Sequence, residues 1–355
     1  MGNNAPTSQL RSTWALLALI ITLLVLLGLS FVLSLSFGSV AYSREQVWQV
    51  VLAHLRGEPV ADTSLDAVIW QLRAPLGLLA LLVGAGLALS GVAMQTLVRN
   101  PLADPYLLGV ASGASVGATA VLTFGLFSSL GVYALSGGAL IGALAATASV
   151  YAITRLQGGF HPLQLILTGV VMSSAFSAAA SFLVFKGPDP RAAQSVMFWL
   201  LGSVAGANFS KLIIPGVVLV IAALIMLAVH RNLDALMAGP DVAASLGVRV
   251  DAMRQLLFVI QALLVGAMVA VAGGIGFVGL VIPHVGRLLV GSLHARLIPV
   301  VMLCGALFLL WVDVLARIAA PPQEIPLGVV TGVLGAPLFL ILMGRKTLRF
   351  QGGQA

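Results

Sequence analysis

The side chains that could carry out chemistry are few and lie far apart in this sequence. The five histidines are isolated from one another, whereas metal sites use clustered ligands at short spacings. A phosphate-binding loop needs Gly-Lys followed by Ser or Thr, and none of the three lysines follows a glycine. Residues 274–279 match the Gly-x-Gly-x-x-Gly dinucleotide pattern, but no predicted strand precedes them and no acidic residue follows at about 20 positions. The sequence therefore predicts no catalytic residue, no metal ligand, no cofactor held by this chain and no enzyme activity.

The composition requires elements that cross a membrane. Of the 355 residues, 60% are hydrophobic and 8% are charged, whereas a soluble domain carries about 25% charged residues. That fraction is about 213 apolar residues, enough for about ten helices of roughly 20 residues each. The apolar runs are continuous, unlike the alternating pattern of barrel strands. We predict an all-α polytopic membrane protein, and the composition excludes a soluble enzyme, a disordered chain and a nucleic-acid-binding surface.

Apolar runs separated by charges, prolines or glycines predict ten transmembrane helices. Their ranges are 12–37, 67–95, 104–124, 130–154, 162–185, 210–230, 251–273, 275–292, 296–319 and 325–344, with a shorter apolar helix near 192–205. The glycine-rich join near 273–276 could also be a bend within one longer span. With the N-terminus inside, 11 basic residues lie inside and 7 outside, in agreement with the positive-inside rule. Both termini are therefore predicted in the cytoplasm.

Two connections are long enough to carry structure of their own. Residues 38–66 form a polar segment on the outer side, and residues 231–250 form the only comparable cytoplasmic gap. In the second segment, Asp241 is predicted as a helix N-cap and Gly247 as the C′ residue that ends the helix. The pattern fits a short helix between two turns or a plain surface loop about equally well.

Small polar residues and one carboxylate stand out within the predicted spans. Ser173, Ser177 and Ser181 share one helical face, which could line a permeation path or allow close helix packing. Asp313 is the main carboxylate within a span, and Arg317 follows one turn later, where the two can pair. Ion-coupled transporters usually place ionisable residues at the midplane of the membrane, and this sequence has almost no carboxylates within its spans. That near-absence speaks against a secondary transporter that works without an ATPase, which remains the alternative.

Several segments resemble the permease subunits of the iron-siderophore, haem and cobalamin uptake ABC transporters, the FecCD/BtuC-like family. The similarity runs from about residue 66 to 345, in the order found in the family. The segments that carry it are Arg73-Ala-Pro75, Gly84-Ala-Gly-Leu-Ala-Leu-Ser-Gly-Val-Ala-Met-Gln95, Asn100-Pro-Leu-Ala-Asp-Pro-Tyr-Leu-Leu-Gly109, Ser112-Gly-Ala-Ser115, Gly274-Ile-Gly-Phe-Val-Gly-Leu-Val-Ile-Pro-His-Val-Gly-Arg287, Asp313-Val-Leu-Ala-Arg317 and Glu324-Ile-Pro-Leu-Gly-Val-Val-Thr-Gly-Val-Leu-Gly-Ala-Pro337.

The resemblance implies a type II ABC importer permease fold in the cytoplasmic (inner) membrane, with residues 1–355 as one transmembrane permease domain. Such permeases pair as homodimers around a cargo path, and two ATP-binding subunits that hold ATP and Mg lie beneath the pair. The resemblance implies that residues 231–250 are the coupling loop that docks on an ATPase. The coupling residues expected from it are Asp234, Asp241, Ala243, Ala244, Ser245, Leu246 and Gly247. It also favours a lining role for the three serines.

The resemblance further implies docking of a periplasmic or extracellular substrate-binding protein on outer arginines. Arg73 and Arg317 match the family's docking positions, although Arg317 could instead pair with Asp313. Some cobalamin-type members carry a second arginine three residues after the first, where this chain has Leu76, which weakens a cobalamin-specific assignment. The expected function is import of a ferric siderophore, haem or a related metal-chelate, with cobalamin retained among the candidates. A membrane-embedded enzyme would need a cluster of reactive side chains that the sequence lacks.

Overall fold

The fold is built from helices throughout the part of the chain that the structure describes. The structure is a computed structural model, and it describes residues 13–38, 40–321 and 323–351. No strand occurs among these residues. Because helices satisfy their own backbone hydrogen bonds, they can cross hydrocarbon where open sheets cannot. The predicted all-α membrane fold is confirmed.

Seven helical segments are long and apolar enough to cross a membrane, and three shorter apolar helices accompany them. Four of the long segments are single helices, α1 (Thr13–Ser34), α7 (Pro162–Lys186), α12 (Val250–Ala272) and α14 (His294–Ile318). The other three join several elements. They are Thr63–Leu97 with α3 (Thr63–Asp66), η1 (Ala67–Arg73) and α4 (Ala74–Leu97), Ser128–Leu156 with η3 (Ser128–Tyr133) and α6 (Ala134–Leu156), and Phe209–Ala228 with η4 (Phe209–Leu212) and α9 (Ile213–Ala228). The shorter ones are α5 (Val110–Phe124), α13 (Val278–Val290) and the apolar part, Leu327–Ile341, of α15 (Leu327–Gln351).

Each of the ten predicted spans coincides with one of these helices. The largest shift is at the start of the third span, because Asp104 caps a short 3-10 turn, η2 (Pro105–Leu108), before α5 begins. At the glycine-rich join, Gly273 adopts a φ of 67° and the chain leaves the helix, so α12 and α13 are separate helices. Since α5 and α13 have only 15 and 13 residues, ten complete crossings stay a prediction.

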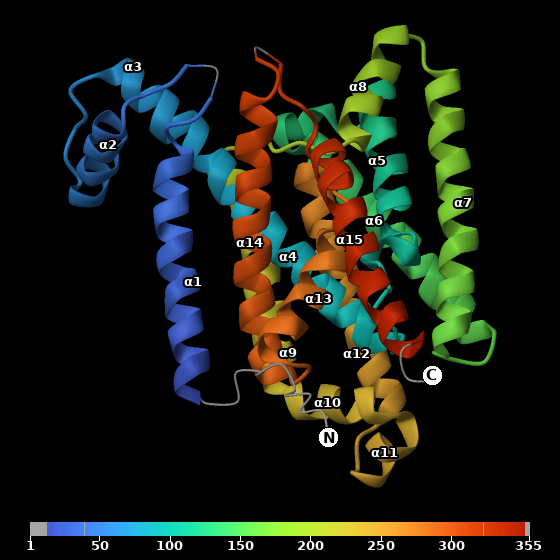
Figure 1. Ribbon diagram of the computed structural model, residues 1–355. Helices are drawn as coiled ribbons and strands as arrows, with labels where there is room; N and C mark the ends of the chain where they lie inside the picture. The colour runs from blue at the N-terminus through green and yellow to red at the C-terminus, as the bar shows by residue number, and fades with distance from the viewer. Residues whose placement is uncertain (1–12, 39, 322, 352–355) are drawn as a thin grey trace.

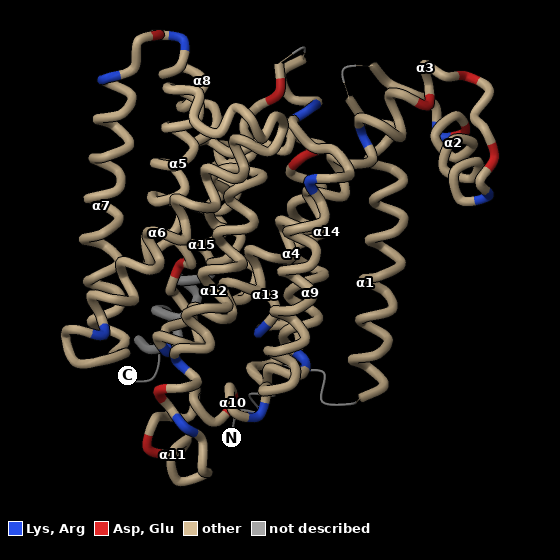
Figure 2. The backbone as a smooth tube through the Cα atoms, turned by 180° about the vertical axis from the view of Figure 1, so that it is seen from behind, with Lys and Arg blue, Asp and Glu red and all other residues tan. Residues whose placement is uncertain are grey.

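Short helices gather at the two ends of the bundle (Figure 1). One end, here called the α11 end, carries α10 (His230–Ala238) and α11 (Pro240–Ser245). The opposite end, here called the α8 end, carries α2 (Arg44–Arg56), α3 and α8 (Pro190–Leu200). Most charged residues also lie at these two ends (Figure 2). Helix α1 begins and α15 finishes at the α11 end, so the first and last helices place both chain ends on the same side.

Helix α4 forms the centre of the bundle. It runs obliquely through the middle of the molecule (Figure 1), and almost every residue along it is buried. It packs against α14, α12, α13 and α9, whereas α1 and α7 lie at opposite edges. Where lipid rather than water surrounds the helices, their association depends on close van der Waals packing rather than on a hydrophobic driving force.

Glycines allow α4 and α14 to touch through their backbones. A Cβ atom added at Gly84 would lie 2.2 Å from the carbonyl oxygen of Gly305, and one at Gly305 would lie 2.4 Å from that of Gly84. Both distances are far inside van der Waals contact, so only glycine fits at this crossing. Helices α5 and α6 meet in the same way, because a Cβ added at Gly117 would overlap the carbonyl oxygen of Gly138.

We expect Gly84→Ala to force α4 and α14 apart and to lower the free energy of unfolding by about 1–3 kcal/mol, the usual effect of overpacking. The matched control is Gly28→Ala on α1, where an added Cβ meets no atom within 4 Å. Denaturant unfolding of each variant in detergent measures the difference. Equal stability of the two variants would contradict the close contact.

Candidate functional site

The α10–α11 segment presents an exposed face at the α11 end. Of the predicted coupling residues, Asp241, Ala244, Ser245, Leu246 and Gly247 are exposed, and Leu246 exposes 68% of its surface. Ala243 is fully buried and Asp234 is partly buried, so these two support the segment from within. Val242, which was not among the predicted coupling residues, is also exposed, with 45% of its surface accessible one helical turn before Leu246.

The ends of α11 match the sequence prediction at one end only. Gly247 has a φ of 80°, and the backbone N–H of Val248 bonds to the carbonyl of Ala243, so Gly247 ends the helix as predicted. Asp241 is not the N-cap, because the helix begins at Pro240 and the cap is Gly239. Proline suits the first helical position, and Asp241 instead lies in the first turn, where a negative charge is favourable. The predicted helix is therefore confirmed and its N-cap was wrong.

A buried histidine ties this segment to the helices of the bundle. His294 at the start of α14 is 2% exposed, and its Nδ1 lies 2.6 Å from Oδ1 of Asp234 on α10. The backbone N–H of His294 donates to the same oxygen at 2.9 Å, so the carboxylate also caps α14. On the other side of the ring, Nε2 lies 2.9 Å from the hydroxyl oxygen of Thr96 on α4. One imidazole thus joins α10, α14 and α4, here called the His294 link.

The sequence indicated Asp234 as a coupling residue but gave no sign of its contact with His294, or of that between His294 and Thr96. Asp234 and His294 are 60 residues apart, and Thr96 and His294 are 198 apart, so no local spacing signals the contact. The structure places Asp234 facing the bundle rather than the exposed face of α10–α11.

The serine stripe on α7 faces α5 in part. Ser177 Oγ lies 3.3 Å from Ser112 Oγ on α5, and Ser181 donates back to the carbonyl of Ser177 at 2.9 Å. Ser177 and Ser181 remain exposed, while Ser173 is half-buried near Gly109. The stripe therefore contributes both to packing against α5 and to an open surface, and its lining role stays a prediction.

Arg73, at the end of η1, is enclosed by the chain that leaves α1. Its Nη1 donates to the carbonyl of Leu35 at 2.8 Å and its Nη2 donates to the carbonyl of Val40. The guanidinium lies 5.0 Å from the centroid of the Tyr42 ring, within cation–π range. Its side chain therefore satisfies two backbone oxygens in the segment that follows α1.

Arg317 on α14 approaches the same end of α1. Its Nη1 donates to the carbonyl of Phe37 at 2.8 Å, and its Nη2 lies 3.5 Å from the carbonyl of Ser34. Its Nη2 also lies 2.8 Å from Oδ2 of Asp313, in an ion pair whose side chains are only 5% and 3% exposed. The pairing with Asp313 that the helical spacing allowed is confirmed.

Both predicted docking arginines are thus occupied inside the chain. Arg73 and Arg317 are each 6% exposed, and each donates to carbonyls at the end of α1. A soluble partner could reach them only if the end of α1 moved away. Docking through these two residues stays a prediction.

We expect His294→Asn to loosen α10, because it removes the imidazole that bonds the partly buried Asp234 carboxylate, a loss worth about 1–3 kcal/mol. Hydrogen exchange of the α10 amides should then rise about tenfold or more. His161→Asn is the matched control, since His161 is exposed and caps α7 without a side-chain hydrogen bond. Unchanged exchange in α10 would show that the His294 link does not hold the helix.

Arg317→Met should lower the free energy of unfolding by about 3–5 kcal/mol, because it leaves the Asp313 carboxylate buried without its cation. Adding Asp313→Leu to that variant should recover most of the loss, since the unpaired charge is gone. The control is Arg191→Met, at the exposed start of α8. A loss for Arg317→Met no larger than for this control would contradict the structural role of the pair.

Comparison with known proteins agrees with the helix arrangement. The family model described as the FecCD transport family matches residues 22–345, and so includes most of α1 as well as the motifs from residue 66 onward. The chain is 38% identical over 321 residues to the molybdate import system permease protein MolB of Haemophilus influenzae, covering 90% of this chain and 94% of that one. It is 36% identical over 337 residues to the hemin transport system permease protein HmuU of Yersinia pestis, covering 93% and 96%.

A solved structure of a metal-chelate type ABC transporter in an inward-facing conformation has the same fold, with a TM-score of 0.81 and 36% identity, covering 92% of this chain and 99% of that chain. The predicted type II importer permease fold is confirmed by this likeness. Because the family model covers almost every helix described above and the relatives align over their full length, the chain belongs to the FecCD transport family.

Proposed function

We propose that this chain is the transmembrane permease subunit of an ATP-driven importer, and that residues 231–250 are its coupling loop. The observation that carries the proposal is the exposed α11 turn, which the His294 link connects to two long helices of the bundle. A chain without a Gly-Lys phosphate-binding loop needs such a feature if ATP hydrolysis on a separate subunit is to move its helices. Family membership supports the same reading.

The partners that this function requires are a second copy of the chain, two ATP-binding subunits holding ATP and Mg, and a soluble substrate-binding protein. The ATPase would dock at the α11 end, where Val242 and Leu246 expose apolar side chains. The binding protein would approach the α8 end, with the chain in the cytoplasmic membrane and both termini inside. Arg73 and Arg317 would contribute to that contact only in a state where the end of α1 has moved.

The cargo that we propose is a metal-chelate such as haem or a ferric siderophore. The support is the likeness to a hemin transport permease and to a metal-chelate type transporter. Molybdate is tested beside it, because a molybdate permease is at least as similar. Cobalamin is tested as well, because it is among the candidates that the sequence leaves open. The exposed part of the serine stripe, Ser177 and Ser181, offers small and weakly polar groups suited to a bulky cargo passing between two copies.

Leu246→Arg should abolish the stimulation of the partner ATPase by cargo and binding protein while leaving folding intact, because Leu246 is 68% exposed and its change disturbs only a docking contact. The matched control is Leu156→Arg at the end of α6, which is 87% exposed and lies outside residues 231–250. ATPase turnover is measured on the reconstituted complex. Normal stimulated turnover in Leu246→Arg would remove this residue from the coupling surface.

Uptake into proteoliposomes tests the function as a whole. The permease is reconstituted with the candidate ATPase and binding protein and offered labelled haem, a ferric siderophore, cobalamin and molybdate in parallel, with and without ATP. Accumulation of one cargo that requires ATP and both partners is the expected result. Accumulation driven by an ion gradient without the ATPase would overturn the proposal in favour of a secondary transporter.

A further inference from the structure

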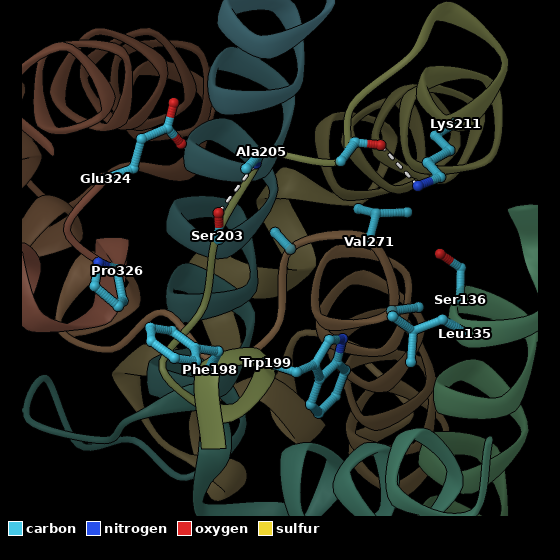
Figure 3. Close-up of a pocket in the computed structure, with 13 residues that line it drawn as sticks. Leu135, Ser136, Phe198, Trp199, Ser203, Ala205, Lys211, Val271, Glu324 and Pro326 are labelled. Carbon is cyan, nitrogen blue, oxygen red and sulfur yellow. Dashed lines mark hydrogen bonds between the residues drawn. The ribbon is translucent and has the colours of Figure 1, made fainter. Parts of the chain in front are cut away.

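Two adjoining cavities open at the α8 end of the bundle. The first has a volume of about 370 Å³ and lies between α8, the start of α6, the end of α12 and the loop that carries Glu324 (Figure 3). The second, of about 170 Å³, lies between α6, α9 and α12. They share four lining residues, Ser136, Lys211, Ala270 and Val271, so the two cavities lie next to each other and Lys211 lines both.

The two cavities differ in chemistry. In the first, Lys211 and Glu324 lie on opposite sides of the space, with Ser203 between them and Ser136 on the side of Lys211 (Figure 3). The second is lined mainly by aliphatic residues such as Leu140 and Ile214, and Lys211 is the only charged residue among those described that line it. A polar chamber with both signs of charge thus adjoins an apolar groove.

The Lys211 ammonium group has hydrogen-bond donors left for a further partner. It donates one hydrogen bond, to the carbonyl of Gly206 at 2.7 Å. An ammonium group has three N–H donors, so two remain for an anionic oxygen in the chamber.

The groove lies beside an exposed apolar face of α9. Helix α9 follows Lys211 directly, and its exposed residues include Ile213, Val217, Ile221 and Leu224, as expected for contact with hydrocarbon. Trp199 lines the first cavity and Tyr133 lines the second, and such aromatic rings collect at the level of lipid headgroups. Because α9 runs from Lys211 to α10 at the α11 end, the chamber lies at the opposite membrane surface.

We propose that this space binds a phospholipid of the outer leaflet with a primary-amine headgroup, such as phosphatidylethanolamine. The phosphate lies on Lys211, the ammonium group points to Glu324, and one acyl chain enters the groove between α6, α9 and α12. The paired charges of the chamber sum to zero and match a zwitterionic headgroup, whereas a purely anionic lipid would leave its charge facing Glu324. The site is independent of the proposed transport function, since it requires only that the chain sits in a bilayer with its α8 end facing outward.

Native mass spectrometry of the full-length chain, delipidated in mild detergent, tests the site by titration with phosphatidylethanolamine, phosphatidylcholine and phosphatidylglycerol. Phosphatidylethanolamine is expected to bind tightest. Lys211→Gln should weaken its binding about tenfold, because the charge-assisted contact to phosphate is lost. Glu324→Gln should retain phosphate binding but remove the preference for phosphatidylethanolamine over phosphatidylcholine.

Two further variants separate the site from general effects. Gly137→Leu places a side chain in the groove, where an added Cβ has room, with Leu130 Cδ1 as its nearest neighbour at 3.7 Å. It should reduce lipid binding as Lys211→Gln does. Lys186→Gln, at the exposed end of α7 and outside both cavities, should leave binding unchanged. Equal lipid binding by wild type, Lys211→Gln and Gly137→Leu would overturn the site, and tighter binding of phosphatidylglycerol would overturn the headgroup assignment.

Discussion

A bilayer core offers no hydrogen bonds to a peptide group, and the arrangement of this protein depends on that constraint. Within a helix the backbone satisfies itself, but the last carbonyls and the first N–H groups of each helix have no partner of their own. Where the chain leaves α1, Arg73 and Arg317 supply donors to the carbonyl of its last residue, Ser34, and to three carbonyls of the segment that follows. Burying two guanidinium groups is costly, and the Asp313 carboxylate offsets part of that cost.

The α11 end shows the converse case, in which a carboxylate accepts a hydrogen bond from a backbone N–H group. There the first N–H of α14 needs an acceptor, and Asp234 provides it from α10. The imidazole of His294 uses the same carboxylate and carries the connection on to Thr96. The middle of the bundle is therefore held by contacts between small residues, and its two ends are held by a few charged side chains that also fix the connecting segments.

Sequence patterns predicted the helices well because hydrocarbon tolerates little else. Long apolar runs, the stop at Gly247 and the i,i+4 pair of Asp313 and Arg317 are local signals, and each corresponds to the structure. What escaped prediction is non-local. Nothing in the spacing of Arg73 indicates that the carbonyl of Leu35, 38 residues earlier, occupies its guanidinium. Similarly, the inward orientation of the predicted coupling residue Asp234 could not be predicted, because its partner His294 lies on a helix distant in sequence.

The crossing of Gly84 and Gly305 limits how the bundle can move. With the two backbones in contact, a slide by one helical turn, about 5.4 Å, would bring a side chain such as that of Ala88 into a space that holds none. Helices α4 and α14 are thus interlocked against translation, and both are fastened to α10 through one imidazole. A displacement of α10 would therefore move α4 and α14 together, because the two helices cannot pass each other by a full turn and both are bonded to the same imidazole.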